Sequence, residues 1–505
     1  MCGIFFYKSK DDCDKTKLDI YGKRCSHRGP DNTKTHSIYY KNNYMYFMFH
    51  RLSINGLNSV SDQPLHKNNN ILMCNGEIYN YKSLAKRYNI TLESDSDCEI
   101  ILHLYEFMDI GTLCNNLDGV FSFVLYDNSQ KKIIVGHDPY GIRSLYYYHN
   151  DTEIGISSEM KCLYDLNSNI EFYPPGSYSI FDIDTNNCIT NKYYDLIYPP
   201  IEYDESITIE NIRKILNLSV EKRTITDRPI GCLLSGGLDS SIIASIMSKK
   251  IKNLKTFSIG LNDSPDLYHA ENVANHLNTD HTIVLVSEKQ MLDAIERTIY
   301  QIESYDITTI RASVPMLLLS EYIRDNSDIK VLLSGEGSDE ASGSYLYFHN
   351  APDSQSFQEE CIRLLRDVQY FDVLRGDKTT AGAGLEIRVP FFDKTFMEYY
   401  MSILPSKKMV RDGMEKYLLR KAFEYDLPED VVWRRKDGFS DGVSSFDKPW
   451  HGIIEEYAQK KYNMTESDMY KHIYVKYYSG VENIPYMWMP KWSNSKDPSN
   501  RSIAL

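Results

Sequence analysis

Several features that would place this chain in a common class of protein are missing from its sequence. No apolar run approaches the ~20 residues of a membrane-spanning helix. The chain does not open with a basic segment followed by an apolar one, so we expect no secretory signal. Its 10 cysteines are scattered without any CxxC spacing, which argues against a zinc module and against a disulfide framework. We therefore expect a protein of the reducing cytosol with no membrane partner.

An excess of positive charge is missing as well. The formal net charge is -14, because 70 Asp and Glu outnumber 56 Lys and Arg. A general nucleic-acid surface needs clustered Lys and Arg, so we expect no nucleic-acid partner. What is present suits a globular enzyme, with 42% hydrophobic and 25% charged residues. A length of 505 residues predicts two or more domains.

The character of the sequence changes near residue 200. The first part contains short β-like runs separated by turn signals such as Gly29-Pro30-Asp31 and Asn75-Gly76, with a helix near 97–107. This pattern predicts an α+β unit with antiparallel sheets over residues 1–195. The expected strands are 3–7, 44–49, 71–74, 120–126, 133–136 and 145–148. Residues 198–206 look like a linker, with prolines and acidic residues but no periodicity.

Beyond the linker, expected strands alternate with expected helices, which predicts an α/β domain with a parallel, doubly wound sheet over residues 206–505. The strands are expected at 229–234, 254–259, 282–286 and 330–333. The helices are expected at 208–224, from 240 onwards and near 266–277. After about residue 355 the pattern is mostly helical.

Cys2 is the first residue whose position suggests chemistry. Removal of Met1 would leave a thiol and a free α-amine on one residue. An amine with an ordinary pKa of about 8 can take the proton of the thiol, and the thiolate is the nucleophile. The alternative is a cysteine that only opens a buried strand and packs as a small hydrophobic residue.

A glycine-rich turn follows the first expected strand of the second part. It reads Ser235-Gly236-Gly237-Leu238-Asp239-Ser240-Ser241 and leads into a helix. Backbone N–H groups of such a turn and the helix N-terminus can hold an anion, and Asp239 suits a phosphate site if Mg²⁺ lies between them. It lacks the Lys-Ser/Thr ending of a Walker A loop. The alternative is a glycine turn that only caps a helix.

A second loop, Ser334-Gly335-Glu336-Gly337-Ser338-Asp339-Glu340, follows another expected strand. Its glycines permit close backbone approach, and its carboxylates suit metal binding or base chemistry. Alone it could be an acidic surface loop, but two such loops at strand ends of one sheet indicate a nucleotide site. Residues 433–439 add a basic segment that could lie over phosphates or be an exposed loop.

Taken together, these features resemble the glutamine-hydrolysing asparagine synthetase family, and residues 235–241 resemble the pyrophosphate loop of ATP pyrophosphatases. The resemblance runs from Cys2 to about Val443. It is carried by Cys2-Gly3-Ile4, Ser26-His27-Arg28-Gly29-Pro30-Asp31, His50-Arg51-Leu52-Ser53-Ile54, Asn75-Gly76-Glu77-Ile78-Tyr79-Asn80, Ser96-Asp97-Cys98-Glu99, Ser158-Glu159-Met160-Lys161, Ser264-Pro265-Asp266, Thr308-Thr309-Ile310-Arg311, Glu386-Ile387-Arg388-Val389-Pro390-Phe391 and the two loops.

The resemblance implies that residues 1–195 are an N-terminal-nucleophile glutaminase domain, an αββα sandwich. Cys2 would attack the side-chain amide of glutamine and form a thioester. Asn75 and Gly76 would form the oxyanion hole, although Asn-Gly is also typical of a type I′ hairpin turn. The residues implied in glutamine binding are Arg51, which would clamp the substrate carboxylate, and Leu52, Ile54, Asn75, Gly76, Glu77 and Asp97.

For residues 206–505 the resemblance implies an ATP-pyrophosphatase domain, of the adenine nucleotide alpha-hydrolase type, that uses ATP and Mg²⁺. Asp239 and Asp339 would hold the Mg²⁺. Thr308 and Arg311 would serve aspartate activation, and Glu336 would help to form and trap β-aspartyl-AMP. The residues implied in ATP binding are Leu233, Ser235, Gly237, Asp239, Ser240, Ile259, Ser334, Gly335 and Lys436.

The implied reaction couples two centres. Aspartate would be adenylated by ATP, and ammonia released from glutamine would cross an apolar passage and give asparagine, glutamate, AMP and pyrophosphate. A homodimer is a further family expectation. The chain departs from the family pattern at three places: Ser144, where a proline is common, Ser342-Gly343-Ser344, where a Gly-Gly pair is usual, and Gly438, where a larger residue is usual.

Four alternatives remain at this point. A related amidotransferase could amidate another carboxylate, or close a ring as β-lactam synthetases do, although the presence of Cys2 argues against the ring-closing relatives. A glutaminase could be uncoupled from synthesis. A non-catalytic family member would need broken motifs, and both sets of motifs are intact.

Overall fold

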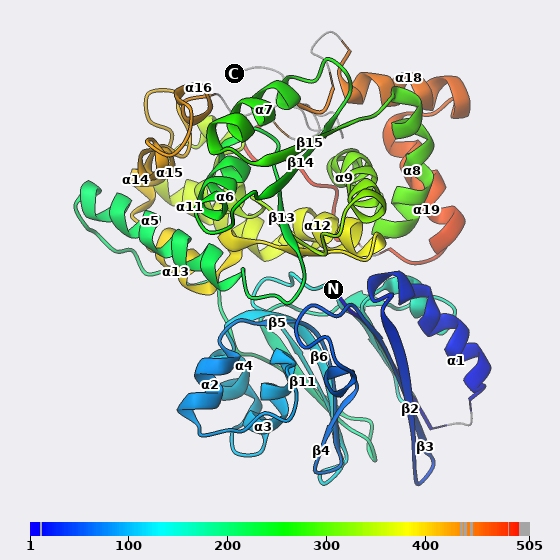
Figure 1. Cartoon of the computed structure of the whole chain (residues 1–505). Coiled ribbons are helices and arrows are strands. Elements are labelled where there is room, and N and C mark those ends of the chain that lie inside the picture. Colours follow the sequence, from blue (N-terminus) through cyan, green and yellow to red (C-terminus); the bar gives the residue numbers. More distant parts are fainter. Residues whose placement is uncertain (11–12, 435–437, 439–441, 445–447, 483, 494–505) are drawn as a thin grey trace.

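The computed structural model describes residues 1–10, 13–434, 438, 442–444, 448–482 and 484–493. Two units are stacked on each other, and the amino terminus lies at their junction (Figure 1). The lower unit contains the two sheets of the first part of the chain. The upper unit contains a third sheet surrounded by helices.

The lower unit is built on two six-stranded antiparallel sheets. In spatial order the first sheet contains β10 (Glu171–Phe172), β8 (Tyr146–His149), β9 (Glu153–Ser157), β1 (Gly3–Ser9), β3 (Asn43–Arg51) and β2 (Asn32–Tyr40). The second contains β12 (Cys188–Lys192), β11 (Ser177–Asp182), β7 (Lys132–His137), β6 (Gly119–Asp127), β5 (Asn70–Ile78) and β4 (Leu65–Lys67).

The alternating direction of side chains along each strand explains how these two sheets stack. Ile4 and Phe6 of β1 join the buried cluster between the sheets, whereas Phe5 and Tyr7 belong to a second cluster on the other face. Successive side chains of a strand point to opposite faces, so a strand apolar at every position is buried on both sides. The αββα sandwich and the antiparallel sheets predicted for this part are confirmed.

Short helices cover the outer faces of the two sheets. They are α1 (Lys15–Gly22), η1 (Lys23–Arg28), η2 (Ser59–Ser61), α2 (Tyr81–Arg87), η3 (Asp97–Glu99), α3 (Ile100–Tyr105), α4 (Ile110–Asn116) and η4 (Met160–Cys162). The expected helix near 97–107 corresponds to η3 and α3.

The upper unit contains a five-stranded parallel sheet, as the alternation of strands and helices predicts. Its order is β15 (Asp280–Leu285), β14 (Lys255–Gly260), β13 (Ile230–Leu233), β16 (Val331–Leu333) and β17 (Glu386–Arg388). The chain runs from β13 outward to β15 and then returns to the other side of β13. The loops after β13 and β16 therefore flank the point where the strand order reverses, where α/β sheets bind ligands.

Helices make up the rest of the upper unit, and none of those in the described ranges is both long and apolar enough to span a membrane. They are α5 (Glu205–Lys222), α6 (Leu238–Ser248), α7 (Pro265–Leu277), α8 (Glu288–Ile302), α9 (Ile307–Asn326), α10 (Ser338–Ser342), η5 (Leu346–Asn350), α11 (Ser354–Asp367), η6 (Val368–Tyr370), α12 (Asp372–Gly382), η7 (Pro390–Phe392), α13 (Lys394–Ser402), α14 (Pro405–Lys408), α15 (Tyr417–Phe423), α16 (Glu429–Val432), α18 (Trp450–Tyr462) and α19 (Glu466–Tyr478).

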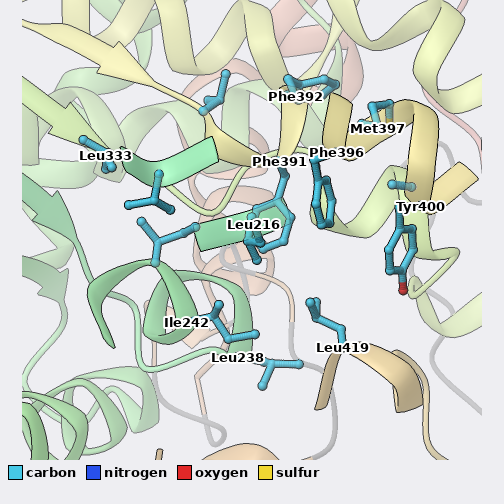
Figure 2. Close-up of a cluster of buried hydrophobic side chains, with 14 of the residues drawn as sticks. Leu216, Leu238, Ile242, Leu333, Phe391, Phe392, Phe396, Met397, Tyr400 and Leu419 are labelled. Carbon is cyan, nitrogen blue, oxygen red and sulfur yellow. The ribbon is translucent and has the colours of Figure 1, made fainter. Parts of the chain in front are cut away.

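A cluster of buried apolar side chains fixes the helices around α6. Figure 2 shows Leu216 of α5 and Ile242 of α6 facing Phe391 of η7 and Phe396 of α13, with Leu419 of α15 beside them. Phe391 and Phe396 meet edge to face at 5.5 Å. This packing holds the start of α6, and hence the glycine-rich turn before it, in place.

Two predictions of local structure are wrong. Asn75-Gly76 does not form a turn, because β5 continues through both residues to Ile78. A Cβ atom on Gly76 would lie 2.2 Å from the carbonyl oxygen of Val120, so glycine is needed there for close strand packing. The fifth strand, β17, was not expected within a region that reads as helical, because it is only three residues long.

A buried ionic network joins the two units. The Arg28 guanidinium donates to Glu159 at 2.7 Å within its own unit and to Asp377 of α12 at 2.8 Å across the junction. Lys378 of the same helix pairs with Glu303, which also accepts from the backbone N–H of Met160 at 2.8 Å. Ser144, at the position where the family commonly has a proline, lies 2.9 Å from Asp377. Breaking a buried pair of this kind is costly, so the units are held in a defined orientation.

Candidate active sites

Cys2 lies where the ends of the two lower sheets meet the upper unit. Its backbone N–H donates to Asn75 Oδ1 of β5 at 2.8 Å, and its Sγ lies 3.7 Å from the Leu52 carbonyl oxygen. Burial raises the pKa of the Cys2 thiol, and the nearby terminal ammonium opposes this effect. The thiol therefore needs a base close by before it can act as a nucleophile.

The terminal amine belongs to Met1 in this structure. Met1 is buried, and its nitrogen lies 3.4 Å from Glu386 Oε2. Burial lowers the pKa of this amine. With Met1 present the nitrogen of Cys2 is an amide, which cannot serve as a base. Removal of Met1 would place a free Cys2 amine against Asn75 Oδ1.

Asn75 is the clearest candidate for stabilising an oxyanion. Its Oδ1 is occupied by the Cys2 N–H, whereas its buried Nδ2 has no hydrogen-bond partner among the described residues. Buried polar groups are normally paired, so a donor left without a partner next to a nucleophile indicates a ligand atom. Gly76, the other residue assigned to the oxyanion hole, follows it in β5.

Asp97 and Glu77 bring two buried carboxylates to the same place. Asp97 accepts a hydrogen bond from the Ile78 N–H at 2.6 Å, and Glu77 accepts one from Asn55 at 2.6 Å. Burial raises the pKa of Asp97 to about 6. Burial and the carboxylate of Glu386 also raise the pKa of Glu77 well above its usual range. A cationic ligand such as a substrate ammonium would compensate these charges.

The upper unit supplies one wall of this site through β17, which the sequence did not predict. Arg388 lies 3.0 Å from Glu77, and its Nε donates to Glu386 at 2.8 Å. Burial alone would raise the pKa of Glu386, but Arg388, the terminal ammonium and Arg143 outweigh it and lower the pKa to about 2. Glu386 and Arg388 stand in a motif that carries the family resemblance, yet no role was assigned to them.

Arg51, the predicted carboxylate clamp, is held by its own loop. It donates to Asp62 Oδ1 at 2.5 Å, to the Asn58 carbonyl at 3.0 Å and to the carbonyls of Asn55 and Gly56. A substrate carboxylate would exchange with one of these acceptors. Leu52 and Ile54 are buried in the same extended apolar cluster as Met1, and the Leu52 carbonyl oxygen lies 3.7 Å from Cys2 Sγ.

The upper unit contains a second site, a cavity of about 560 Å³ at the carboxyl end of its sheet. Every described residue that the sequence assigned to ATP, metal or aspartate lines this cavity; Lys436 lies outside the described residues. The lining includes Leu233, Ser235, Gly237, Asp239, Ser240, Ile259, Thr308, Arg311, Ser334, Gly335, Glu336 and Asp339. Phe257 and Met316 add apolar surface beside Leu233 and Ile259, which suits a planar base.

The loop between β13 and α6 has the geometry of an anion cradle. Gly236 has φ +73, and a Cβ atom there would lie 2.5 Å from the Ala270 nitrogen. Among the described residues, a Cβ atom on Gly237 would contact only Ser235 Oγ, at 3.3 Å, so no other described atom crowds the backbone at this point. The start of α6 adds its N–H groups and the positive end of its dipole.

The acidic loop after β16 packs directly on this cradle. A Cβ atom on Gly335 would lie 2.8 Å from the Ser240 nitrogen, so only glycine permits the approach. Ser338 donates to Asp239 Oδ1 at 2.7 Å. The two loops therefore form one continuous wall, although nearly a hundred residues of sequence separate them.

Lys416 is a residue that sequence analysis missed. Its buried Nζ donates to Asp239 at 2.6 Å and to Asp339 at 2.5 Å, so it joins the two carboxylates assigned to Mg²⁺. Its φ of 59 is uncommon for a residue other than glycine. A single lysine between short helices has no distinctive sequence signal.

The charge of the cavity suits a metal-bound polyanion. Among the described residues of its lining, carboxylates outnumber cations, and burial together with the proximity of Asp372 and Asp339 raises the pKa of Glu340. The carboxylates are Asp239, Asp266, Glu336, Asp339, Glu340, Asp372 and Glu415, and the cations are Arg311, Arg375, Lys416, Arg420 and Arg434. Asp239 and Asp339 have the oxygen donors that Mg²⁺ prefers. Within the described ranges, no group of three or more His, Cys, Asp or Glu could hold a metal by itself, so a bound metal would need further ligands.

The groups assigned to the acid substrate line the same cavity. Arg375, also missed in the sequence, donates to Glu336 at 2.7 Å and to Asp372 at 2.6 Å. Thr308 donates to Asp306 at 2.7 Å. Arg311 forms a two-point contact with Glu466 of α19, with its Nε 2.8 Å from Oε1. A substrate carboxylate would thus meet an arginine that already has one acidic partner.

Comparison with known proteins gives matches over nearly the whole chain. A family model described as Asparagine synthase matches residues 211–360 and 351–479, and one described as Glutamine amidotransferase domain matches residues 1–193. The glutamine-hydrolysing asparagine synthetases of Rattus norvegicus and Homo sapiens are each 38% identical over 554 residues, with 100% of this chain and 98% of the relative covered. The solved glutamine phosphoribosylpyrophosphate amidotransferase from B. subtilis is 14% identical, with 66% of this chain and 81% of that chain covered and a TM-score of 0.33.

Proposed function

The chain belongs to the family of glutamine-hydrolysing asparagine synthetases, and we propose how the residues of its two sites divide that reaction. The overall reaction uses ATP to make asparagine from aspartate with nitrogen taken from glutamine. The lower site would release ammonia, and the upper cavity would activate aspartate. Their boundaries would be residues 1–195 and 206–505.

Cys2 is the proposed nucleophile of the lower site. After removal of Met1, the Cys2 amine accepts the thiol proton, and the thiolate attacks the side-chain carbonyl carbon of glutamine. The carbonyl oxygen becomes negatively charged, and Asn75 Nδ2 and the Gly76 N–H donate to it. The C–N bond then breaks, ammonia leaves with the proton returned by the amine, and water hydrolyses the thioester to glutamate.

Substrate orientation in the lower site follows from charge. Arg51 would hold the α-carboxylate of glutamine, and Asp97 and Glu77 would hold its α-ammonium. The wall formed by Glu386 and Arg388 means that the glutamine site is complete only when the upper unit is docked.

The upper cavity would make the acyl-adenylate. The β-carboxylate of aspartate attacks the α-phosphorus of ATP, the bond to the β-phosphate oxygen breaks, and pyrophosphate leaves in the cradle of Ser235, Gly237 and Ser240. Asp239 and Asp339 would hold Mg²⁺, which neutralises charge on the phosphates when bound. Leu233 and Ile259 would contact adenine, and Ser334 and Gly335 would contact the remaining adenosine.

Ammonia completes the reaction at β-aspartyl-AMP. Its nitrogen attacks the acyl carbon, Glu336 accepts a proton, and AMP leaves as the amide of asparagine forms. Ammonia must remain unprotonated in transit. Met1, Leu52 and Ile54 belong to the same buried cluster as Ile387 and Val389 of the upper unit, which supports an apolar route between the sites.

Each unit contributes one observation to this proposal. In the lower unit, the Cys2 thiol lies near Asn75 Nδ2, a buried donor without a partner among the described residues. In the upper unit, all described candidates for nucleotide and aspartate binding line one cavity. Purified protein would be supplied with ATP, Mg²⁺, aspartate and glutamine, and asparagine, AMP and pyrophosphate would be measured. We expect the three products in equal amounts. Glutamate release without asparagine would contradict the synthetase assignment.

Two further proposals concern context. We infer a cytosolic location, in keeping with ten cysteines that all carry free thiols. We also infer from the family that the protein is a homodimer. Analytical sedimentation or light scattering would test this oligomeric state.

A further inference from the structure

The segment after α19 forms part of the synthetase cavity, although it lies beyond the residues that the family model matches. The Asparagine synthase model ends at residue 479, yet Trp488 and Pro490 line the cavity. None of the residues assigned from the resemblance lies in this segment. Its contribution to the site therefore becomes visible only in the folded chain.

Backbone and side-chain contacts hold this segment in place. The Trp488 N–H donates to Asp306 Oδ2 at 2.7 Å, and the other oxygen of Asp306 accepts from Thr308 at 2.7 Å. Two residues earlier, Tyr486 accepts a hydrogen bond from Arg363 at 2.7 Å and lies against Phe371 with ring centroids 5.6 Å apart. Trp488 thus shares its anchor, Asp306, with a residue assigned to aspartate activation.

The indole of Trp488 lies against two tyrosines. Its centroid is 5.6 Å from that of Tyr345 and 6.0 Å from that of Tyr347, both edge to face. The Tyr345 hydroxyl lies 3.3 Å from Asp372, which accepts from Arg375, the partner of Glu336. Trp488 is therefore connected to Thr308 through its backbone N–H and Asp306, and its indole is connected to Glu336 through Tyr345, Asp372 and Arg375.

The C-terminal helices reinforce the same corner. Glu466 of α19 holds the Arg311 guanidinium, and Trp450 of α18 donates its Nε1–H to the Arg311 carbonyl at 3.2 Å. Three separate C-terminal contacts thus converge on residues 306–311. Arg311 is thus held both at its guanidinium and at its backbone carbonyl, which restricts how far it can shift to meet an acid of a different length.

We propose that Trp488 is a specificity-determining residue, a rigid wall that limits the length of the acid substrate to that of aspartate. This inference rests on the proposed activation of aspartate in this cavity. Glutamate carries one more methylene between its carboxylates, so its reacting carboxylate and its α-carboxylate could not both reach their partners without displacing the indole. One methylene in a well-packed site is worth about 10- to 200-fold in kcat/KM.

The test compares Trp488→Ala with Trp492→Ala. Trp492 lies on the same segment and packs on Tyr347 with ring centroids 6.0 Å apart, but it does not line the cavity. With ammonia as nitrogen source, acid-dependent pyrophosphate release is measured for aspartate and for glutamate. We expect Trp488→Ala to lower the aspartate-to-glutamate ratio of kcat/KM about 10-fold or more. Trp488→Phe should give an intermediate ratio, and the KM for ATP should stay within about 2-fold of the wild-type value.

An unchanged ratio in Trp488→Ala, or an equal change in Trp492→Ala, would overturn the inference. Glutaminase activity, which depends on the other site, reports whether each variant folds. If Trp488→Ala does not fold, the aspartate-to-glutamate ratio of kcat/KM is compared between the wild-type protein, Trp488→Phe and Trp488→Leu. Wild-type protein that forms no asparagine contradicts the proposed function itself. Wild-type activity with an unchanged ratio in the variants contradicts only the role of Trp488.

Discussion

The two sites of this protein differ in how they are shielded from solvent and in how their charges are balanced. The Cys2 site is buried at the junction of the units, and strand β17 of the upper unit closes one side of it. The synthetase cavity lies at the carboxyl end of a parallel sheet, where most cations of the described lining already have a carboxylate partner.

This difference follows from the two kinds of chemistry. A covalent step needs one nucleophile, one base and an oxyanion donor, all shielded from water. Transfer of an adenylyl group needs little covalent help but must neutralise a polyanion, so it needs many fixed charges. If the two sites are as separate as this comparison implies, a change in one of them should leave the activity of the other intact.

The largest effect is expected at Cys2. Cys2→Ala should lower glutamine hydrolysis and glutamine-dependent synthesis by at least about 10⁴-fold, because the nucleophile itself is lost. Synthesis from free ammonia should be retained. Glutamate and asparagine would be measured in parallel, with Cys188→Ala as a control for a cysteine outside the site. Loss of both activities would contradict two separate centres.

Lys416→Met should affect only the upper site. Without Lys416, two carboxylates face each other without the cation that joins them, and we expect synthesis from ammonia to fall about 10²- to 10³-fold. Glutaminase activity should be retained. Lys421→Met removes a lysine of α15 that pairs with Glu424 and serves as the matched control. Equal losses in the two variants would argue against a role for Lys416 in catalysis.

Asn75→Ala should affect only the lower site. Removal of one oxyanion donor is expected to lower the kcat of glutaminase about 100-fold with little change in KM. Ammonia-dependent synthesis serves as the internal control and should not change. A raised KM with unchanged kcat would instead place Asn75 in substrate binding.

Asp97 should make the activity of the lower site depend on pH in the weakly acidic range. Its pKa is raised to about 6, so the carboxylate is charged above pH 6 and neutral below it. Because the charged form would bind the substrate ammonium, kcat/KM for glutamine should fall as the pH drops below about 6, approaching tenfold per unit. In Asp97→Asn this pH dependence should disappear and activity should be low throughout. A pH dependence that persists in the variant would have another origin.

Ser144→Ala should give the smallest effect and tests the junction. The variant loses a contact with Asp377, whose net contribution should be about 1 kcal/mol, so Tm should fall by at most about 2 °C. Both activities should persist with nearly the same ratio of glutamate to asparagine. A large rise in that ratio would show that coupling depends on this contact.

Local sequence motifs predicted the two folds and most of the candidate residues, because each motif lies within one loop or strand. The glycine-rich turn at 235–241 could be placed from its neighbours alone, since the strand before it and the helix after it decide its geometry. Asn75-Gly76 shows the limit of such reasoning. The dipeptide favours a hairpin turn locally, but the close approach of β6 keeps it extended.

The sequence by itself determined the class of chemistry, through Cys2 near the start of the chain and the two glycine-rich loops. It also determined that the first part forms antiparallel sheets and the second a parallel sheet. Only the tertiary structure decided which isolated side chains join them, among them Glu386 and Arg388 beside Cys2, Lys416 between two aspartates, and Trp488 in the lining of the synthetase cavity. The physical reason is that motifs report contacts between neighbours in sequence. Charge pairing and packing act between neighbours in space, and those arise only once the chain has folded.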